Sequence, residues 1–177
     1  MKKQIKLEIE IPEGIDVEVK GSKIEISKGD AKLSRNLQKK VDKRENKIII
    51  EEKLAGKRER KIMGTIRAHI KNMIKGLEEP YEYKLKICSV HFPMNVSIEN
   101  KKLIVKNFLG ETKPRELKLR DNVEVNINGD VIEVKSIDKE LAGQTAADIE
   151  KTTRINNKDR RIFQDGIYIT EKPGRKI

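Results

Sequence analysis

The sequence predicts an α+β fold made of two tandem homologous modules, each a small, mostly antiparallel sheet assembly packed on one helix, plus a basic C-terminal tail. The first observation behind this prediction is an internal repeat. The segment IPEGIDVEVKGSKIEISKGD returns as FPMNVSIENKKLIVKNFLGE, with Pro12 matching Pro93 and Gly29 matching Gly110 at the same offset of 81 residues. A local shift of two residues is needed to match KIEI with KLIV. The other two observations are that each half contains alternating apolar runs and, after them, one helical stretch.

Strands are predicted in the first half where apolar residues alternate with polar ones, because this period places one strand face on a core. Gly21-Ser22 and Gly29-Asp30 separate successive runs, so this half is predicted as a series of hairpins, with a further short strand after Asp30. The runs are Ile5, Leu7, Ile9 and Ile11; Ile15, Val17 and Val19; Ile24 and Ile26; and KIIIEE after Asn46.

A helix is predicted from Lys57 to Gly76, because apolar residues recur there at spacings of three and four and fall on one stripe. The residue before Pro80 is pushed out of helical geometry. We therefore expect the helix to stop at Gly76 and Glu78-Glu79-Pro80 to form a short linker. The stripe consists of Ile62, Ile66, Ile70, Met73, Ile74 and Leu77.

The second half repeats this scheme, with strands predicted at YEYKLKI, NVSIE, KLIVKNF, ELKLR, VEVNI and VIEVK. Asn128-Gly129 separates the last two, and Asn-Gly between alternating runs is the strongest short-range hairpin signal. A second helix is predicted to start near Asp138, whose side chain can cap it, and to continue through LAGQTAADIEKTTR. The predicted boundaries are residues 1–80 and 81–156 for the two modules and 157–177 for the tail.

The chain is strongly basic: Lys and Arg total 40, Asp and Glu total 29, and the net charge is +11 with a pI near 9.6. This balance indicates a polyanionic partner and makes the chain a candidate nucleic-acid-binding protein. Residues 1–80 carry +7, residues 81–150 carry −1 and residues 151–177 carry +5. The excess therefore lies in two zones, residues 53–75 around the first helix and the tail.

The cysteine content and the N-terminal sequence also indicate the cellular compartment of the protein. Cys88 is the single cysteine, which excludes an intramolecular disulfide, and the N-terminal MKKQIKLEIE lacks the apolar run of a signal peptide or membrane span. We therefore expect a soluble, cytoplasmic protein with no membrane partner. Aromatic residues make up only 3% of the chain, which weakens the case for a small-molecule pocket.

Each basic zone allows two interpretations. Residues 53–75 hold eight basic side chains and one acidic one, which suits a phosphate-binding face, but a solvated polar face is an equally good reading of a charge run. The tail KDRRIFQDGIYITEKPGRKI joins cations to Phe163 and Tyr168, rings that can stack on bases, and a disordered tail is the alternative. Its candidate cations are Arg160, Arg161, Lys172, Arg175 and Lys176.

Gly143, Gln144 and Thr145 form a third candidate site. They are predicted in the first turns of the second helix, where backbone amides and the helix dipole favour a phosphate oxygen. Close packing of Gly143 and Ala147 against a sheet is the alternative, and the match of Gly143 with Gly64 favours a packing role that both glycines share.

The sequence contains no recognisable catalytic constellation. His69 and His91 are expected to be packed or surface histidines, and together with Cys88 they lack the spacing of a metal site. Phosphate-loop, dinucleotide-binding and serine-elbow motifs are also missing. We therefore expect no enzymatic activity, no cofactor and no metal.

Four segments of the sequence carry a family resemblance: GTIRAHIKNMIKG (64–76), FPMNVSIENKKLIVKNFLGE (92–111), LAGQTAADIE (141–150) and RRIFQDGIYI (160–169). Together they resemble the family of the universal large-subunit ribosomal protein six, whose eukaryotic counterpart is called protein nine, and the last segment is similar to the archaeal and eukaryotic branch. The resemblance covers the whole chain. It implies a structural protein of the large subunit that binds rRNA near the sarcin–ricin loop, at the base of the lateral stalk where translation factors dock.

The resemblance also implies that the second module and the tail make the main rRNA contacts, and that the first module has the smaller RNA role. Neighbouring large-subunit and stalk-base proteins are further implied partners, with translation factors nearby. A basic adaptor that binds another polyanion or an acidic protein remains the alternative. The residues carried over from the family are Lys139, Gly143, Gln144, Thr145, Lys151, Arg154, Arg160, Arg161 and Gln164.

Overall fold

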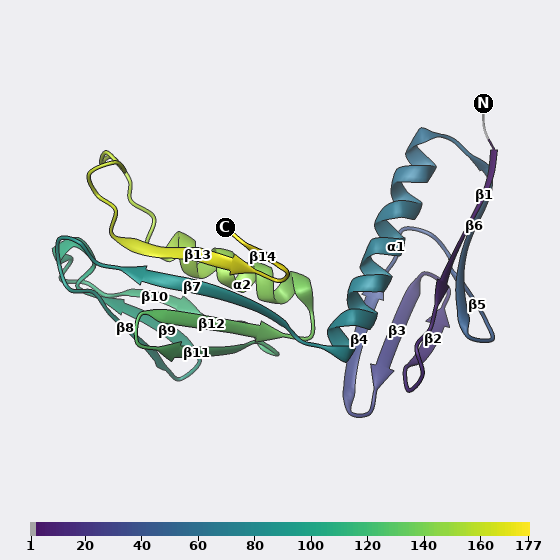
Figure 1. Cartoon of the computed structure of the whole chain (residues 1–177), viewed down its shortest axis with the longest axis horizontal. Coiled ribbons are helices and arrows are strands. Elements are labelled where there is room, and N and C mark those ends of the chain that lie inside the picture. Colours follow the sequence, from purple (N-terminus) through teal and green to yellow (C-terminus); the bar gives the residue numbers. More distant parts are fainter. Residues whose placement is uncertain (1–2) are drawn as a thin grey trace. The chain divides into compact units, whose positions relative to one another are not determined.

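The computed structural model describes residues 3–177, which divide into two compact units at the Glu79–Pro80 boundary (Figure 1). Each unit combines antiparallel sheets with one α-helix. The predicted fold class, two α+β modules in tandem, is therefore confirmed.

The first unit consists of strands β1 to β6 and helix α1. Strands β1, β6 and β5 form one sheet in that order, and β2, β3 and β4 form the other. Ile9 of β1 lies opposite Ile48 of β6, and both side chains are buried, as the alternating pattern predicts. The elements are β1 (Lys3–Glu10), β2 (Asp16–Lys20), β3 (Lys23–Lys28), β4 (Ala31–Asn36), β5 (Asp42–Arg44), β6 (Lys47–Ala55) and α1 (Lys57–Glu78).

Helix α1 begins after Gly56, whose backbone amide donates a 2.9 Å hydrogen bond to the Glu59 side chain. The prediction that the helix stops at Gly76 is wrong by two residues. Gly76 is buried within α1, and the chain leaves helical geometry only at Glu79, which precedes Pro80. The buried side chains of the helix are Met63, Ile66, Ile70, Met73, Ile74 and Leu77.

The second unit contains a three-stranded sheet in the order β10-β9-β8 and a five-stranded sheet in the order β11-β12-β7-β13-β14. The Asn128-Gly129 hairpin is confirmed between β11 and β12. The elements are β7 (Tyr81–Cys88), β8 (Asn95–Glu99), β9 (Lys102–Lys106), the short 3-10 turn η1 (Phe108–Gly110), β10 (Arg115–Lys118), β11 (Glu124–Asn128), β12 (Val131–Ser136), α2 (Lys139–Thr152), β13 (Gly166–Lys172) and β14 (Arg175–Lys176).

The two units follow the same order of elements, which is the structural counterpart of the sequence repeat. The β1-β6-β5 sheet corresponds to β7-β12-β11, and β2-β3-β4 corresponds to β8-β9-β10. The second unit adds β13 and β14 on the free side of β7. Much of the predicted tail is therefore part of this unit, since Gly166–Lys172 is a strand of its larger sheet.

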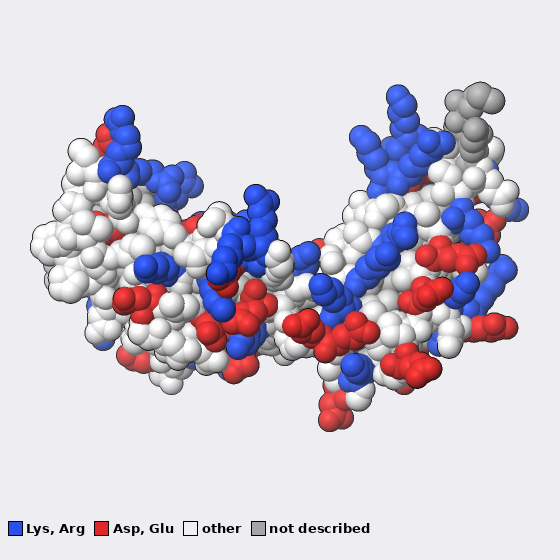
Figure 2. Space-filling view, in the orientation of Figure 1, with Lys and Arg blue, Asp and Glu red and all other residues white. Residues whose placement is uncertain are grey.

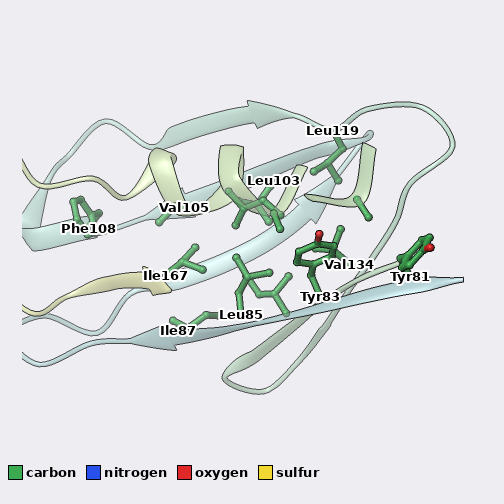
Figure 3. Close-up of a cluster of buried hydrophobic side chains, with 14 residues drawn as sticks. Tyr81, Tyr83, Leu85, Ile87, Leu103, Val105, Phe108, Leu119, Val134 and Ile167 are labelled. Carbon is green, nitrogen blue, oxygen red and sulfur yellow. The ribbon is translucent and has the colours of Figure 1, made fainter. Parts of the chain in front are cut away.

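A single core joins both sheets of the second unit to α2 (Figure 3). Its fully buried side chains come from six different elements, β7, β9, η1, β12, α2 and β13. Ile167, which the sequence placed in the tail, is 0% exposed and belongs to this core. The other central members are Leu85 of β7, Leu103 of β9, Ile132 of β12 and Ile149 of α2.

Candidate nucleic-acid interface

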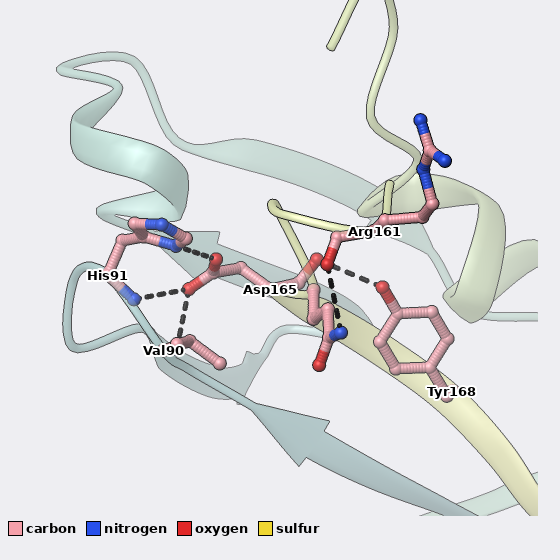
Figure 4. Close-up of polar contacts among 6 residues, drawn as sticks. Val90, His91, Arg161, Asp165 and Tyr168 are labelled. Atoms are coloured by element: carbon pink, nitrogen blue, oxygen red, sulfur yellow. Dashed lines mark hydrogen bonds and ion pairs between the residues drawn. The ribbon is translucent and has the colours of Figure 1, made fainter. Parts of the chain in front are cut away.

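The loop that carries Arg160 and Arg161 is anchored at its far end by Asp165 (Figure 4). This carboxylate is 2% exposed and accepts hydrogen bonds from the backbone amides of Val90, at 2.7 Å, and His91, at 2.9 Å. It also contacts the His91 ring nitrogen Nδ1 at 2.6 Å. Burial raises the pKa of the Asp165 carboxyl, but the hydrogen bonds from His91 and Val90 together lower it by more than burial raises it. The pKa therefore lies below its usual range.

Ring contacts hold the same loop against the connection between β7 and β8. The His91 ring stacks on Phe163 with ring centroids 4.9 Å apart. The Lys158 ammonium lies 4.5 Å from the Phe163 centroid, a cation–π geometry. The sequence had suggested Phe163 as a ring for base stacking, but in the structure one protein ring and one cation already contact it.

Three predicted cations meet at the C-terminal end of α2. Lys151, Arg154 and Arg160 line a pocket of about 260 Å³ together with Tyr168 and Ile167. The lining also includes one carboxylate, Glu150, which accepts a hydrogen bond from the Ile169 amide. Within residues 3–177, Arg154 and Arg160 form no ion pair, and Lys151 reaches Asp148 only at 3.9 Å. Arg160 lies close enough to Tyr168 to oppose the rise in its pKa that burial causes. The two arginines, which have no internal carboxylate partner among the described residues, are therefore available to an external anion.

The pocket is built on backbone that other residues fix in place. Arg115 donates to the carbonyl oxygens of Thr152, at 2.8 Å, and Arg154, at 3.3 Å, so it satisfies groups that the end of a helix leaves unpaired. On the other wall, Thr153 Oγ1 accepts a 2.8 Å hydrogen bond from the amide of Ile167. Lys151 therefore projects from the helix and Arg154 from backbone that Arg115 holds, which lowers the entropy lost when a ligand binds.

The predicted phosphate cradle at residues 143–145 is not available in the structure. Helix α2 begins at Lys139, and its first amides are capped by Asp138, which accepts from Glu140 at 2.8 Å. Gly143 lies one turn further on, where backbone amides already bond within the helix. Thr145 is 1% exposed, so its hydroxyl does not reach an outside partner.

Gly143 instead has the packing role that the sequence left as its alternative. A Cβ atom at Gly143 would lie 2.9 Å from the Tyr83 hydroxyl. The expectation that Gly64 shares this role is wrong, because Gly64 is exposed and a Cβ atom there would meet nothing within 4 Å. Gly64 and Gly143 therefore occupy matching positions of the repeat but do not make the same packing contact.

The remaining predicted residues are dispersed over the second unit, with Lys139 half-buried and the others exposed. Gln144 donates to Asp148 at 2.8 Å, and Lys139 lies 5.5 Å from the Tyr81 ring centroid. Arg161 is held in its own loop by Asp159, with a 2.8 Å ion pair. Gln164 donates to the Arg161 carbonyl at 3.1 Å, and the β13–β14 hairpin presents Lys172, Arg175 and Lys176.

The basic zone of the first unit is fully exposed. Figure 2 shows Lys and Arg side chains gathered over the N-terminal part of α1. All eight cations of residues 53–75 are exposed, and within the described chain none of them forms an ion pair. They are Lys53, Lys57, Arg58, Arg60, Lys61, Arg67, Lys71 and Lys75.

Sequence reasoning missed Asp165, His91 and Arg115 as the residues that position the candidate interface. Asp165 contacts His91, 74 positions away, and Arg115 contacts Thr152, 37 positions away. A local sequence pattern cannot predict contacts over such distances. Among the described residues, His, Cys, Asp and Glu side chains nowhere gather in threes that suit a metal ion. Neither helix is long and apolar enough to cross a membrane.

Comparison with known proteins identifies the family. The model of the family described as "Ribosomal protein L6" matches the chain twice, over residues 7–79 and 92–166, which are the two halves of the repeat. The chain is 44% identical to "Large ribosomal subunit protein uL6" of Methanococcus vannielii over 98% of this chain and 97% of that protein. It is 38% identical to the protein of the same name from Methanothrix thermoacetophila, over 97% of this chain and 99% of that protein. The chain therefore belongs to the ribosomal protein L6 family, a family of structural proteins and not of enzymes, and its similarity to these relatives is of the archaeal type.

Proposed function

We propose that this structural protein of the large ribosomal subunit binds rRNA mainly through its second unit, with Lys151, Arg154 and Arg160 as the central phosphate contacts. The observation that carries the proposal is their convergence around one pocket of about 260 Å³ at the end of α2. Arg and Lys at a helix C-terminus are also stabilised by the helix dipole, so the site holds its charges at little cost. Phosphate contacts of this kind supply most of the affinity of proteins for nucleic acids.

The loop of residues 157–164 and the β13–β14 hairpin extend the proposed surface on either side of the pocket. Arg161 and Gln164 lie in the loop, and Lys172, Arg175 and Lys176 lie in the hairpin. Lys139 and Gln144 are exposed or half-exposed on α2. Gly143 and Thr145 act as packing residues of the same helix.

The proposed position in the subunit is near the sarcin–ricin loop, at the base of the lateral stalk. The names of the relatives support a place in the large subunit, and the position within it rests on the resemblance to the family alone. Neighbouring large-subunit and stalk-base proteins are its proposed protein partners, and translation factors dock nearby. The large net charge of +11 supports a place against RNA.

The test compares two triple variants of the full chain in a mobility-shift assay with an rRNA fragment that contains the sarcin–ricin loop. Replacing Lys151, Arg154 and Arg160 by Gln is expected to weaken binding by roughly ten-fold or more. The matched control replaces Lys106, Lys113 and Lys118, which are exposed in the same unit, by Gln. Equal losses in both variants would show that net charge, and not the pocket, determines the affinity.

Sedimentation separates this function from that of a free adaptor for acidic partners. A ribosomal protein bound by rRNA contacts is expected to travel with large subunits through a low-salt gradient and to be released as the salt concentration rises. An adaptor would remain at the top of the gradient.

A further inference from the structure

One edge of the first unit is open where the corresponding edge of the second unit is covered. In the larger sheet of the second unit, β7 lies between β12 and β13. Its counterpart β1 pairs with β6 on one side, and within residues 3–177 no strand pairs with its other side. Figure 1 shows β1 at the border of its sheet. The second unit therefore shows that the strand edge equivalent to the open edge of β1 can pair with a further strand.

In the second unit, side chains of α2 bind the backbone of the added strand. Glu150 accepts from the amide of Ile169 at 3.2 Å, and Thr153 accepts from the amide of Ile167 at 2.8 Å. The helix therefore offers acceptors to the outward amides of β13, and the strand is held between β7 and α2.

Aligning the two helices on Gly64 and Gly143 shows which residues of α1 stand at the same place. Lys71 corresponds to Glu150, and Ile74 corresponds to Thr153. The acceptors of α2 are thus replaced in α1 by a cation, which donates only, and by an apolar side chain. A segment that lies beside α1 is therefore favoured if its side chains present acceptors to Lys71.

A groove occupies this place in the first unit. It has a volume of about 370 Å³ and is lined by Ile9 of β1 and by Arg67, Lys71 and Ile74 of α1, together with Lys47 and two glutamates of β1. Ile9 and Ile74 are buried beneath it, whereas Arg67 and Lys71 are exposed and form no ion pair within the described chain. Glu8 is already paired with Lys6 and Lys47, and Glu10 is exposed, so the three cations of the lining exceed its two carboxylates by one.

We propose that this groove binds an extended, acidic segment of a partner polypeptide, which adds to β1 as a further strand and places carboxylates against Arg67 and Lys71. Backbone hydrogen bonds to an exposed strand edge give such complexes their affinity, and side-chain pockets give specificity. The pairing of β1 is regular from Ile5 to Glu10, so an incoming strand meets an even edge. The charged residues along β1 disfavour random pairing of edges, which leaves the edge open to a complementary partner.

The test uses the full chain and a fluorescein-labelled octapeptide in which glutamate and valine alternate, followed by fluorescence anisotropy. Binding is expected, together with slower hydrogen exchange of the β1 amides. Lys71→Glu is expected to weaken binding by about ten-fold or more. The matched control is Lys61→Glu, an exposed cation near the other end of α1, which is expected to leave the affinity within about two-fold of the wild type.

Three further measurements make the outcome decisive. A peptide with a central proline, which removes a strand hydrogen bond, is expected to bind much more weakly. Lys71→Gln, which removes the charge without reversing it, is expected to show a smaller loss in the same direction. Melting temperatures of the variants show whether a loss arises from unfolding.

Several results would overturn the proposal. Equal losses of peptide affinity in Lys61→Glu and Lys71→Glu would mean that the peptide binds by general charge attraction. Binding of the proline peptide as tight as that of the original peptide would mean the same. Self-association of the chain that Lys71→Glu abolishes would assign the groove to a second copy. Lys71-dependent binding of an RNA oligonucleotide without peptide binding would assign it to RNA. The rRNA affinity of the second unit is not involved in the peptide assay, so the two proposals fail independently.

Discussion

Asp165 and His91 lie 74 positions apart in the sequence, yet the Asp165 carboxylate accepts from the His91 backbone amide and contacts its ring at 2.6 Å. This contact connects the loop before β13 to the chain after β7. Its consequence is that the loop carrying Arg160 is fixed at one end by Asp165 and at the other by the end of α2. A buried carboxylate that serves three donors is therefore part of the scaffold of the proposed interface.

Replacing Asp165 by Ala is expected to lower the free energy of unfolding by about 2–4 kcal/mol, because the amides of Val90 and His91 lose a charged acceptor. Urea unfolding of the full chain measures the change. Asp159→Ala is the matched control, since Asp159 is exposed and pairs only with Arg161 in its own loop. The control is expected to leave stability nearly unchanged, and equal losses would argue against a structural role specific to Asp165.

The pKa of Asp165 lies below its usual range in the folded chain, which predicts a specific pH dependence. The unfolded chain then binds its proton at higher pH than the folded chain, so the contribution of Asp165 is present above about pH 4 and falls as the pH drops further. In Asp165→Asn this loss is absent. We therefore expect the stability difference between wild type and Asp165→Asn to shrink between about pH 4 and pH 2. A difference that stays constant over this range would contradict the assignment.

The two repeat glycines are expected to respond in opposite directions to alanine. Gly64→Ala adds a methyl group into open space on a helix and is expected to stabilise the chain by up to about 1 kcal/mol. Gly143→Ala places Cβ 2.9 Å from the Tyr83 hydroxyl and is expected to destabilise it by roughly 1–2 kcal/mol. Thermal unfolding measures both. Tyr83→Phe, which removes the hydroxyl, is expected to recover part of the loss in the double variant.

Thr145→Val tests whether the Thr145 hydroxyl serves the fold or the RNA. Within the described chain its Oγ1 atom is buried without a hydrogen-bond partner. Burial of an unpaired hydroxyl is unfavourable, so valine of nearly the same shape is expected to be neutral or stabilising by about 1 kcal/mol. The rRNA affinity is expected to stay unchanged. A marked loss of affinity at full stability would restore Thr145 to the RNA-binding set.

Local sequence patterns were sufficient to predict most strands and both helices. The alternation around Ile9, the Asn128-Gly129 turn and the Asp138 cap each act within a few residues, and the structure confirms all three. The predicted end of α1 at Gly76 is wrong because Gly76 lies on the buried face of the helix. Tertiary burial there outweighs the tendency of glycine to end helices.

The parts that could not be predicted depend on contacts between distant residues. Strand β13 pairs with β7, whose residues lie 78 to 87 positions earlier, and the alternating Ile167 and Ile169 fall in the predicted tail. The convergence of Lys151, Arg154 and Arg160 follows from that pairing, because it brings the end of the chain beside α2. The sequence identified these cations through charge and resemblance, whereas their common pocket is a product of the tertiary fold.

The salt dependence of rRNA binding tests the central claim most directly. The affinity of the full chain for the rRNA fragment is measured between about 50 and 200 mM salt, and contacts to six to ten phosphates predict a fall of roughly a thousand- to a hundred-thousand-fold. The variant with Lys151, Arg154 and Arg160 replaced by Gln is expected to show a salt slope smaller by about two to three, whereas the Lys106, Lys113 and Lys118 control retains the wild-type slope. An affinity that ignores salt, or an unchanged slope in the pocket variant, would contradict the account.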